Sequence, residues 1–303
     1  MPNSTQLREP ERILQRLEWT VIRHLDGMLQ GDYRSLFQGF GLDFEELREY
    51  QFGDDPRTID WNVTARMREP FVRRYLEDRE ISAWFLVDLS PSLNFGTVNT
   101  SKRDLLVDFT ALMMRLLTRH GNSVACAMYD GEKTRVIPML SGRNQVLRII
   151  RDLRALPSKK TTPNAKLSDL LEEAQKTMRK KSLVFVVSDF ISPAGWERPL
   201  RILSRRHETI AVRILDPRES DIPDLGPLWL EDSESGEQIY VNTEDPRFRA
   251  RFREAAFRHE ESLRQSFRNS AVEALSLNTQ DDLTKAVLRF AEMRKQMRSR
   301  FYA

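Results

Sequence analysis

Short runs of consecutive apolar residues alternate with longer amphipathic stretches along most of the chain. Four of the short runs lie at residues 83–87, 124–129, 183–188 and 210–215. Unbroken apolar runs of this length are typical of strands that helices cover on both faces. The amphipathic stretches, in which apolar residues recur at three- and four-residue steps, span 102–120, 144–156, 167–180 and 199–206. The pattern predicts an α/β fold with a Rossmann-like, mostly parallel sheet covered by helices on both faces.

The two ends of the chain extend this pattern. Residues 10–30 have the periodicity of an amphipathic helix, and a glycine-punctuated, loop-rich segment follows. Near the other end, helix 246–269 and helix 281–297 flank a short apolar run that predicts a last strand. We therefore expect an N-terminal helical and loop extension in residues 1–75, and the α/β domain with its C-terminal helices in residues 76–303.

An acidic hairpin is expected after the strand at 210–215. Its arms are Leu228–Leu230 and Gln238–Val241, and Ser235 and Gly236 suit the turn between them. The acidic residues around this turn either bind a partner or keep an exposed sheet edge solvated. The sequence leaves both interpretations open.

The composition is that of an ordinary globular protein. With 303 residues, of which 40% are hydrophobic and 31% charged, the chain can bury a large core. No apolar run is long enough to cross a membrane, and the first residues lack the apolar centre of a secretory signal. A single cysteine, Cys126, forms no internal disulfide, which fits a reducing compartment. We expect a cytoplasmic protein.

Two of the predicted strands end in clusters of oxygen-bearing side chains. Asp88, Ser90 and Ser92 follow the run at 83–87, and Asp189 follows the run at 183–188. In open parallel sheets, ligands bind beyond the carboxyl ends of strands, at the point where the strand order reverses. Hard oxygen donors of this kind suit Mg²⁺, which keeps several waters when it binds a protein. If the two strands are neighbours, the sequence predicts a Mg²⁺ site between them.

Two motifs resemble those of a known bacterial family. The first is the segment Tyr50–Asn62, YQFGDDPRTIDWN, followed by Ala65, Arg66, Arg73 and Tyr75. The second is the Asp-x-Ser-x-Ser sequence that begins at Asp88. Together they are similar to the group known as domain of unknown function 58, with an α/β domain of the von Willebrand factor A type. The resemblance extends over nearly the whole chain.

The resemblance implies a metal-ion-dependent adhesion site, in which a threonine and a later aspartate join the Asp-x-Ser-x-Ser motif. The helix length usual in the family points to Ala165 for the threonine, whereas Thr161 and Thr162 lie a few residues earlier. We expect Thr162 at this position, with Thr161 or a water as alternatives. The ligands expected for Mg²⁺ are Asp88, Ser90, Ser92, Thr162 and Asp189.

The resemblance also implies a role in protein interaction rather than catalysis. In this fold class the bound cation leaves a position for an acidic side chain of a partner protein. Members of the bacterial group resemble partners or adaptors of MoxR-type AAA+ ATPases, and this chain contains neither a GxxxxGK(S/T) loop nor a GxGxxG loop after a strand. We therefore expect a non-enzymatic adaptor in complex assembly or maturation, with the ATPase and an acidic client protein as partners.

Two other functions stay open at this point. The helix at 246–269 carries many arginines, which favour phosphate backbones or an anionic surface. However, the net charge is only +3 and an apolar stripe follows the same helix, so nucleic acid is the less favoured partner. A metal-dependent hydrolase would use Asp88 and Asp189, yet the sequence places no His or Glu beside either as a base.

Overall fold

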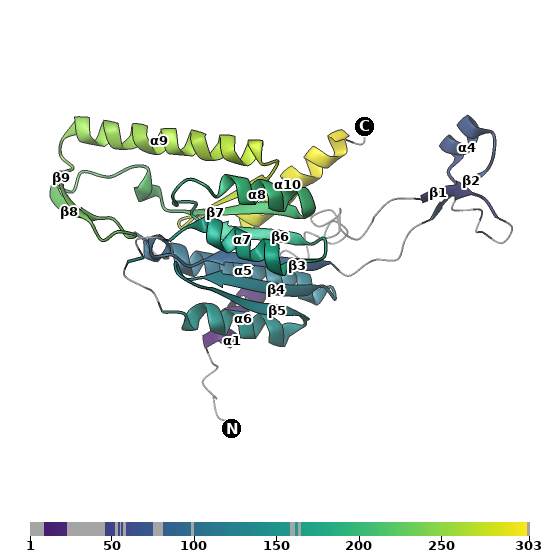
Figure 1. Ribbon diagram of the computed structural model, residues 1–303, viewed down its shortest axis with the longest axis horizontal. Coiled ribbons are helices and arrows are strands. Elements are labelled where there is room, and N and C mark those ends of the chain that lie inside the picture. The colour runs from purple at the N-terminus through teal and green to yellow at the C-terminus, as the bar shows by residue number, and fades with distance from the viewer. Residues whose placement is uncertain are drawn as a thin grey trace, which may run out of the picture.

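A six-stranded sheet with helices on both faces dominates the part of the chain that the structure describes (Figure 1). The computed structural model describes residues 9–22, 46–51, 54, 56, 59–74, 81–97, 100–157, 161–162 and 165–301. The strands of the large sheet are β3 (Ser82–Asp88), β4 (Ser123–Tyr129), β5 (Thr134–Ser141), β6 (Leu183–Ser188), β7 (Glu208–Leu215) and β10 (Glu273–Asn278). The predicted α/β fold is confirmed.

The strand order of this sheet is β10-β7-β6-β3-β4-β5. Neighbouring strands run parallel, except that β4 and β5 are antiparallel. This is the doubly wound order, in which the first strand, β3, lies beside the fourth, β6, and the order reverses between them. Ligands of such sheets bind beyond the carboxyl ends of these two strands, which here end at Asp88 and Ser188.

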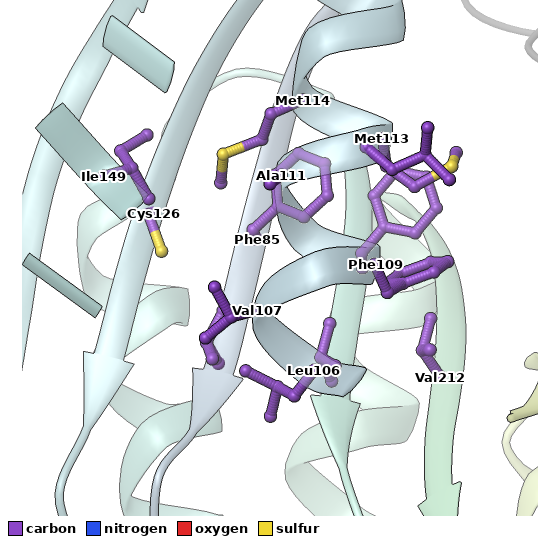
Figure 2. Packing of buried hydrophobic residues seen from close by; sticks show 14 of the residues in the cluster. Phe85, Leu106, Val107, Phe109, Ala111, Met113, Met114, Cys126, Ile149 and Val212 are labelled. Carbon is purple, nitrogen blue, oxygen red and sulfur yellow. The ribbon is translucent and has the colours of Figure 1, made fainter. Parts of the chain in front are cut away.

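Successive residues of each central strand point to opposite faces of the sheet. On one face, Phe85 stacks on Phe185 with ring centroids 4.8 Å apart, and Phe109 meets Phe185 edge-on. Figure 2 shows Phe85 and Phe109 in this cluster. The buried free thiol of Cys126 belongs to the same apolar cluster. The helices that cover this face are α1 (Glu9–Leu17), α5 (Lys102–Arg119), α6 (Arg143–Ala155) and α10 (Leu283–Phe301).

The alternate residues of the same strands, such as Trp84 and Leu86, form a second cluster on the opposite face. Phe190, which follows β6, packs edge-on against Trp196 and Phe267 in this cluster. The helices of this face are α7 (Leu167–Thr177), α8 (Glu197–Arg206) and α9 (Pro246–Asn269). Helices therefore cover the central strands on both sides, which explains their unbroken apolar sequence.

Helix α1 adds a further layer outside α5. It continues into the short π-helix η1 (Glu18–Ile22), and Leu14 and Ile22 are fully buried in the same cluster as α5. Arg16 forms an ion pair of 2.5 Å with Asp108 of α5. The predicted helix at 10–30 is therefore confirmed as far as residue 22, and its remainder lies outside the described residues.

The family-signature segment contributes a small separate sheet. Strand β1 (Glu46–Glu49) pairs antiparallel with β2 (Phe71–Arg74), and helix α4 (Trp61–Met67) lies between them in the chain. Asp60 accepts hydrogen bonds from the backbone N–H groups of Asn62 and Val63, as an N-cap does. The signature residues Phe52, Gly53, Asp55, Arg57, Thr58 and Tyr75 lie outside the described residues.

Strands β8 (Pro227–Glu231) and β9 (Gln238–Asn242) confirm the predicted hairpin. Strand β5, by contrast, was not predicted, because Ile137 is its one buried residue and Pro138 interrupts its pattern. None of the helices in the described part of the chain is long and apolar enough to cross a membrane.

Candidate functional site

The Asp-x-Ser-x-Ser motif turns the chain away from the sheet at the end of β3. Asp88 is buried, and its Oδ1 accepts a hydrogen bond of 2.9 Å from the backbone N–H of Ser90. Its Oδ2 accepts a bond of 2.7 Å from the hydroxyl of Ser188, the last residue of β6. Ser90 directly precedes the 3₁₀ helix η3 (Pro91–Asn94), and Ser92 lies within it. Their hydroxyls lie 3.3 Å apart. The structure therefore brings the three motif residues together at the predicted edge.

Thr162 reaches the same place from the segment before α7. Its side chain is buried, whereas Thr161 is exposed. The Thr162 hydroxyl lies 3.4 Å from Oε2 of Glu234, and Oε1 of the same carboxylate accepts a bond of 3.2 Å from the backbone N–H of Ser92. Glu234 thus links the threonine to the second serine of the motif, and it lines one pocket with Asp88, Ser90 and Ala165.

Gly131, in the turn between β4 and β5, makes room for Thr162. A Cβ atom at this glycine would lie 2.6 Å from the Thr162 hydroxyl, and its φ of +93° disfavours any other residue. The carbonyl of Gly131 also accepts a bond of 2.8 Å from the Tyr129 hydroxyl, which in turn accepts one from the backbone N–H of Lys166. The β4–β5 turn therefore helps to position the threonine.

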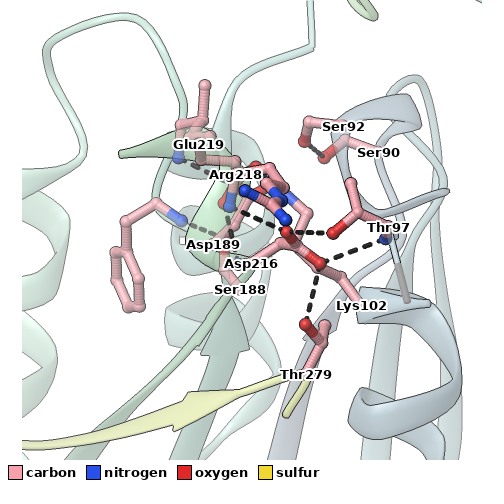
Figure 3. A network of polar contacts seen from close by, with 12 residues as sticks. Ser90, Ser92, Thr97, Lys102, Ser188, Asp189, Asp216, Arg218, Glu219 and Thr279 are labelled. Atoms are coloured by element: carbon pink, nitrogen blue, oxygen red, sulfur yellow. Dashed lines mark hydrogen bonds and ion pairs between the residues drawn. The ribbon is translucent and has the colours of Figure 1, made fainter. Parts of the chain in front are cut away.

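Asp189 lies beside the motif, but its carboxylate faces a lysine that the sequence analysis did not single out. Lys102, the first residue of α5, is fully buried and donates to Oδ2 of Asp189 at 2.7 Å and to Glu219 at 2.5 Å (Figure 3). The backbone N–H of Ile191 donates to Oδ1 of Asp189. Burial lowers the pKa of Lys102, but the two carboxylates outweigh this effect and raise it, so the lysine is charged.

The electrostatics around Asp88 favour a cation. Burial, together with the negative charge of Asp189, raises the pKa of Asp88 to about 6. Burial and the charge of Asp88 also raise the pKa of Glu234. Each of these carboxylates is therefore less stable in its charged form than it would be in water, and a divalent cation would offset their mutual repulsion.

The chemistry of the donors fits a hard divalent cation. The hydroxyls of Ser90, Ser92 and Thr162 and the carboxylate of Asp88 are oxygen ligands of the kind that Mg²⁺ takes. No group of three His, Cys, Asp or Glu side chains in the described ranges is placed to hold a metal. A cation at this edge would therefore depend on the Asp88 carboxylate together with hydroxyls and waters. Asp189, which is bonded to Lys102, adds negative charge from the neighbouring strand.

A third buried carboxylate, that of Asp216, lies close by, just after β7. Asp216 accepts bonds of 2.7 Å from the hydroxyls of both Thr97 and Thr279, and further bonds from the backbone N–H groups of Thr97 and Arg218 (Figure 3). Burial alone would raise the pKa of Asp216, but these hydrogen bonds lower it. Asp216 also caps the 3₁₀ helix η4 (Pro217–Glu219), which carries Glu219 to Lys102.

The sequence contained a signal for some of these additional residues. Asp216 and Glu219 have the spacing of a capping box, and the structure contains both of its hydrogen bonds. Glu234 lies in the acidic hairpin, for which the sequence left a binding role open. Lys102 gave no signal, because a lysine at the start of a helix is usually exposed.

The strand order, with an Asp-x-Ser-x-Ser motif at the carboxyl end of its first strand, defines a von Willebrand factor A-like domain. The chain belongs to the family described as "Protein of unknown function DUF58", whose model matches residues 46–262. Uncharacterized proteins from Mycobacterium bovis and Mycobacterium tuberculosis are each 36% identical to it over 283 residues, covering 93% of this chain and 89% of the relative.

Two solved structures show a weaker likeness. BatB from Bacteroides thetaiotaomicron is 11% identical, covers 71% of this chain and 99% of its own, and has a TM-score of 0.49. The structure described as the SpRpn10 VWA domain is 13% identical, covers 69% of this chain and 94% of its own, and has a TM-score of 0.38.

Proposed function

We propose that this protein is a metal-dependent interaction module that binds an acidic side chain of a partner protein at the carboxyl end of β3. The proposed ligands of a Mg²⁺ ion are Asp88, Ser90, Ser92, Thr162 and Asp189. One observation carries the proposal: a carboxylate, that of Glu234, already lies between the backbone N–H of Ser92 and the hydroxyl of Thr162. The site therefore has the shape and the hydrogen-bond donors to receive an acidic side chain.

The residues of the chain have distinct roles in this proposal. A divalent cation supplies the positive charge that attracts the partner's carboxylate. Ser92 and Thr162 orient that carboxylate through the same N–H and hydroxyl that now contact Glu234. Asp88 holds the motif turn through Ser90. Lys102 offsets part of the negative charge of Asp189, and the remaining charge still acts on Asp88.

The proposed partner is a MoxR-type AAA+ ATPase, with a client protein that offers the acidic side chain. Membership of the family supports this assignment through the resemblance described above. The sequence also lacks a phosphate-binding loop of its own, so a separate ATPase would supply the energy for assembly or maturation. Both proteins would meet this chain in the cytoplasm.

Calorimetry tests the metal site. We expect wild type to bind Mg²⁺ and Asp88→Asn to lose this binding, because the amide removes the negative charge with little change of shape. Asp221→Asn is the matched control, since Asp221 is an exposed aspartate and its ion-pair distance to Arg253 is 3.9 Å. Equal Mg²⁺ binding by wild type and Asp88→Asn would contradict the metal site.

A capture experiment tests the partner. A purified MoxR-type ATPase from the same organism should bind immobilised wild type in Mg²⁺, but neither wild type in EDTA nor Asp88→Asn in Mg²⁺. Asp221→Asn should bind like wild type. Capture that is insensitive to both EDTA and Asp88→Asn would show that the ATPase uses another surface.

A further inference from the structure

Glu234 reaches the site from a distant part of the chain. It lies at the tip of the β8–β9 hairpin, 142 residues after Ser92 and 72 residues after Thr162. Besides its two side-chain contacts, its backbone carbonyl accepts a bond of 3.0 Å from the backbone N–H of Thr162. The tip is therefore attached to both sides of the site, to the motif and to the threonine segment.

The turn that carries Glu234 has a defined shape of its own. The side chain of Asp232 accepts bonds of 2.9 and 2.7 Å from the backbone N–H groups of Glu234 and Ser235. Gly236 follows with a φ of +75°, and its N–H bonds to the carbonyl of Asp232 at 2.8 Å. The turn thus presents Glu234 as a preformed acidic ligand.

The arms of this hairpin bury little of their surface. Trp229 is 66% exposed, Ile239 61% and Tyr240 58%. Moving the hairpin would therefore break few apolar contacts along these strands, while the tip would exchange its bonds to Ser92 and Thr162 for bonds to water.

We propose that the β8–β9 hairpin is an internal ligand: Glu234 fills the position that a partner's acidic side chain takes, and a partner binds only when the tip moves away. The inference rests on the proposed function, since it concerns the same acceptor position. It also identifies the chemistry of the partner segment as an acidic side chain on an exposed turn, like that of Glu234 itself. A tip that is closed in nine of ten molecules would weaken partner binding about tenfold.

The test compares Glu234→Ala with Glu237→Ala, which removes an exposed acidic side chain from the same turn. In metal-free protein, hydrogen exchange at the Ser92 amide should become faster in Glu234→Ala, because this amide donates to the Glu234 carboxylate. The Thr162 amide donates to the backbone carbonyl of residue 234, which the variant keeps, so its exchange becomes faster only if the freed tip moves away. Glu237→Ala should leave both rates unchanged. Unchanged exchange in Glu234→Ala would overturn the internal contact.

The second measurement uses Mn²⁺ as the metal and acetate as the carboxylate, with the protein in excess over Mn²⁺. Paramagnetic relaxation of the acetate methyl protons reports how well acetate reaches the bound metal. We expect acetate to bind Glu234→Ala about tenfold more tightly than wild type or Glu237→Ala, because the internal competitor is gone. Calorimetry should show that Mn²⁺ itself binds all three proteins with similar affinity.

The outcomes separate the inference from the proposed function. Equal acetate binding in wild type and Glu234→Ala would overturn the inference alone, provided that Asp88→Asn abolishes Mn²⁺ binding. Loss of Mn²⁺ binding in Glu234→Ala as complete as that in Asp88→Asn would also overturn it, because Glu234 would then be a permanent ligand. If wild type binds no Mn²⁺, the proposed function fails, and the metal-free exchange still decides whether Glu234 closes the position.

Discussion

Two buried aspartates at the same edge of the sheet, Asp88 and Asp216, have opposite surroundings. They are almost equally inaccessible, at 4% and 1% exposed. Asp216 accepts four hydrogen bonds from the protein, which lower its pKa, whereas Asp88 lies near Asp189 and has a pKa raised to about 6. The protein thus stabilises the charge of Asp216 by itself, but it leaves part of the charge of Asp88 for a ligand from outside.

Lys102 contacts both surroundings, through Asp189 beside Asp88 and through Glu219 in the 3₁₀ helix that Asp216 caps. Its replacement should have the largest effect on stability. Replacing it with Met would leave the buried carboxylate of Asp189 without a counter-ion and remove the partner of Glu219. We expect a loss of about 3 to 5 kcal/mol in the free energy of unfolding, measured by urea denaturation. The double variant Lys102→Met with Asp189→Asn should recover part of this loss. A midpoint equal to that of wild type would show that the ion pairs contribute little.

Removing the Asp216 carboxylate should have the next largest effect. Asp216→Ala leaves the Thr97 and Thr279 hydroxyls and two backbone N–H groups without their acceptor, so we expect a loss of about 2 to 3 kcal/mol in urea denaturation. Because its pKa is lowered on folding, Asp216 stabilises the fold above the ordinary pKa of aspartate, and this stabilisation disappears as the pH falls through the lowered value. The difference between wild type and Asp216→Asn should therefore shrink from pH 7 to pH 3.

Addition of Mg²⁺ should stabilise the protein through Asp88 and not through Asp216. At ten times its Kd, Mg²⁺ should stabilise wild type by about 1.4 kcal/mol, seen as a rise in Tm that EDTA reverses. Asp216→Asn should keep this response, starting from its lower Tm. A response of the same size in Asp88→Asn would contradict the proposed position of the cation.

The smallest expected effect is that of Asp88→Asn on the metal-free protein. Loss of the charge weakens the hydrogen bond that residue 88 accepts from Ser188, but it also relieves the repulsion from Asp189. The free energy of unfolding should therefore change by no more than about 1 kcal/mol. Thermal unfolding in EDTA checks this value. If Asp88→Asn destabilises the protein as much as Asp216→Asn does, the two aspartates are both structural and the comparison fails.

The sequence was sufficient to predict the central strands, because burial on both faces requires an unbroken apolar run that few other structures need. The edge strand β5 escaped prediction for the same reason: its outer side is exposed, and Pro138 interrupts the pattern. The predicted site required β3 and β6 to be neighbours, which the sequence alone did not show. The observed pairing of Val87 with Val187 meets this requirement.

The candidate site was predicted only as far as local motifs extend. Asp88, Ser90 and Ser92 lie within five residues, whereas the family resemblance pointed to Ala165 for the threonine and left Thr162, Thr161 or a water as candidates. Lys102 and Glu234 depend on contacts between segments 87 and 142 residues apart, which no local pattern encodes. The charge balance of the site therefore became visible only in the folded chain.

Helix α5 is covered along most of its surface: between Lys102 and Thr118 each residue is buried or half-buried, although the Asp104 side chain itself is 41% exposed. Part of the cover comes from α1, which precedes the matched family region of residues 46–262. A shortened protein that starts at residue 46 would present an apolar helix surface to water and tend to aggregate. The smallest unit that keeps α5 covered therefore begins before the residues that the family model matches.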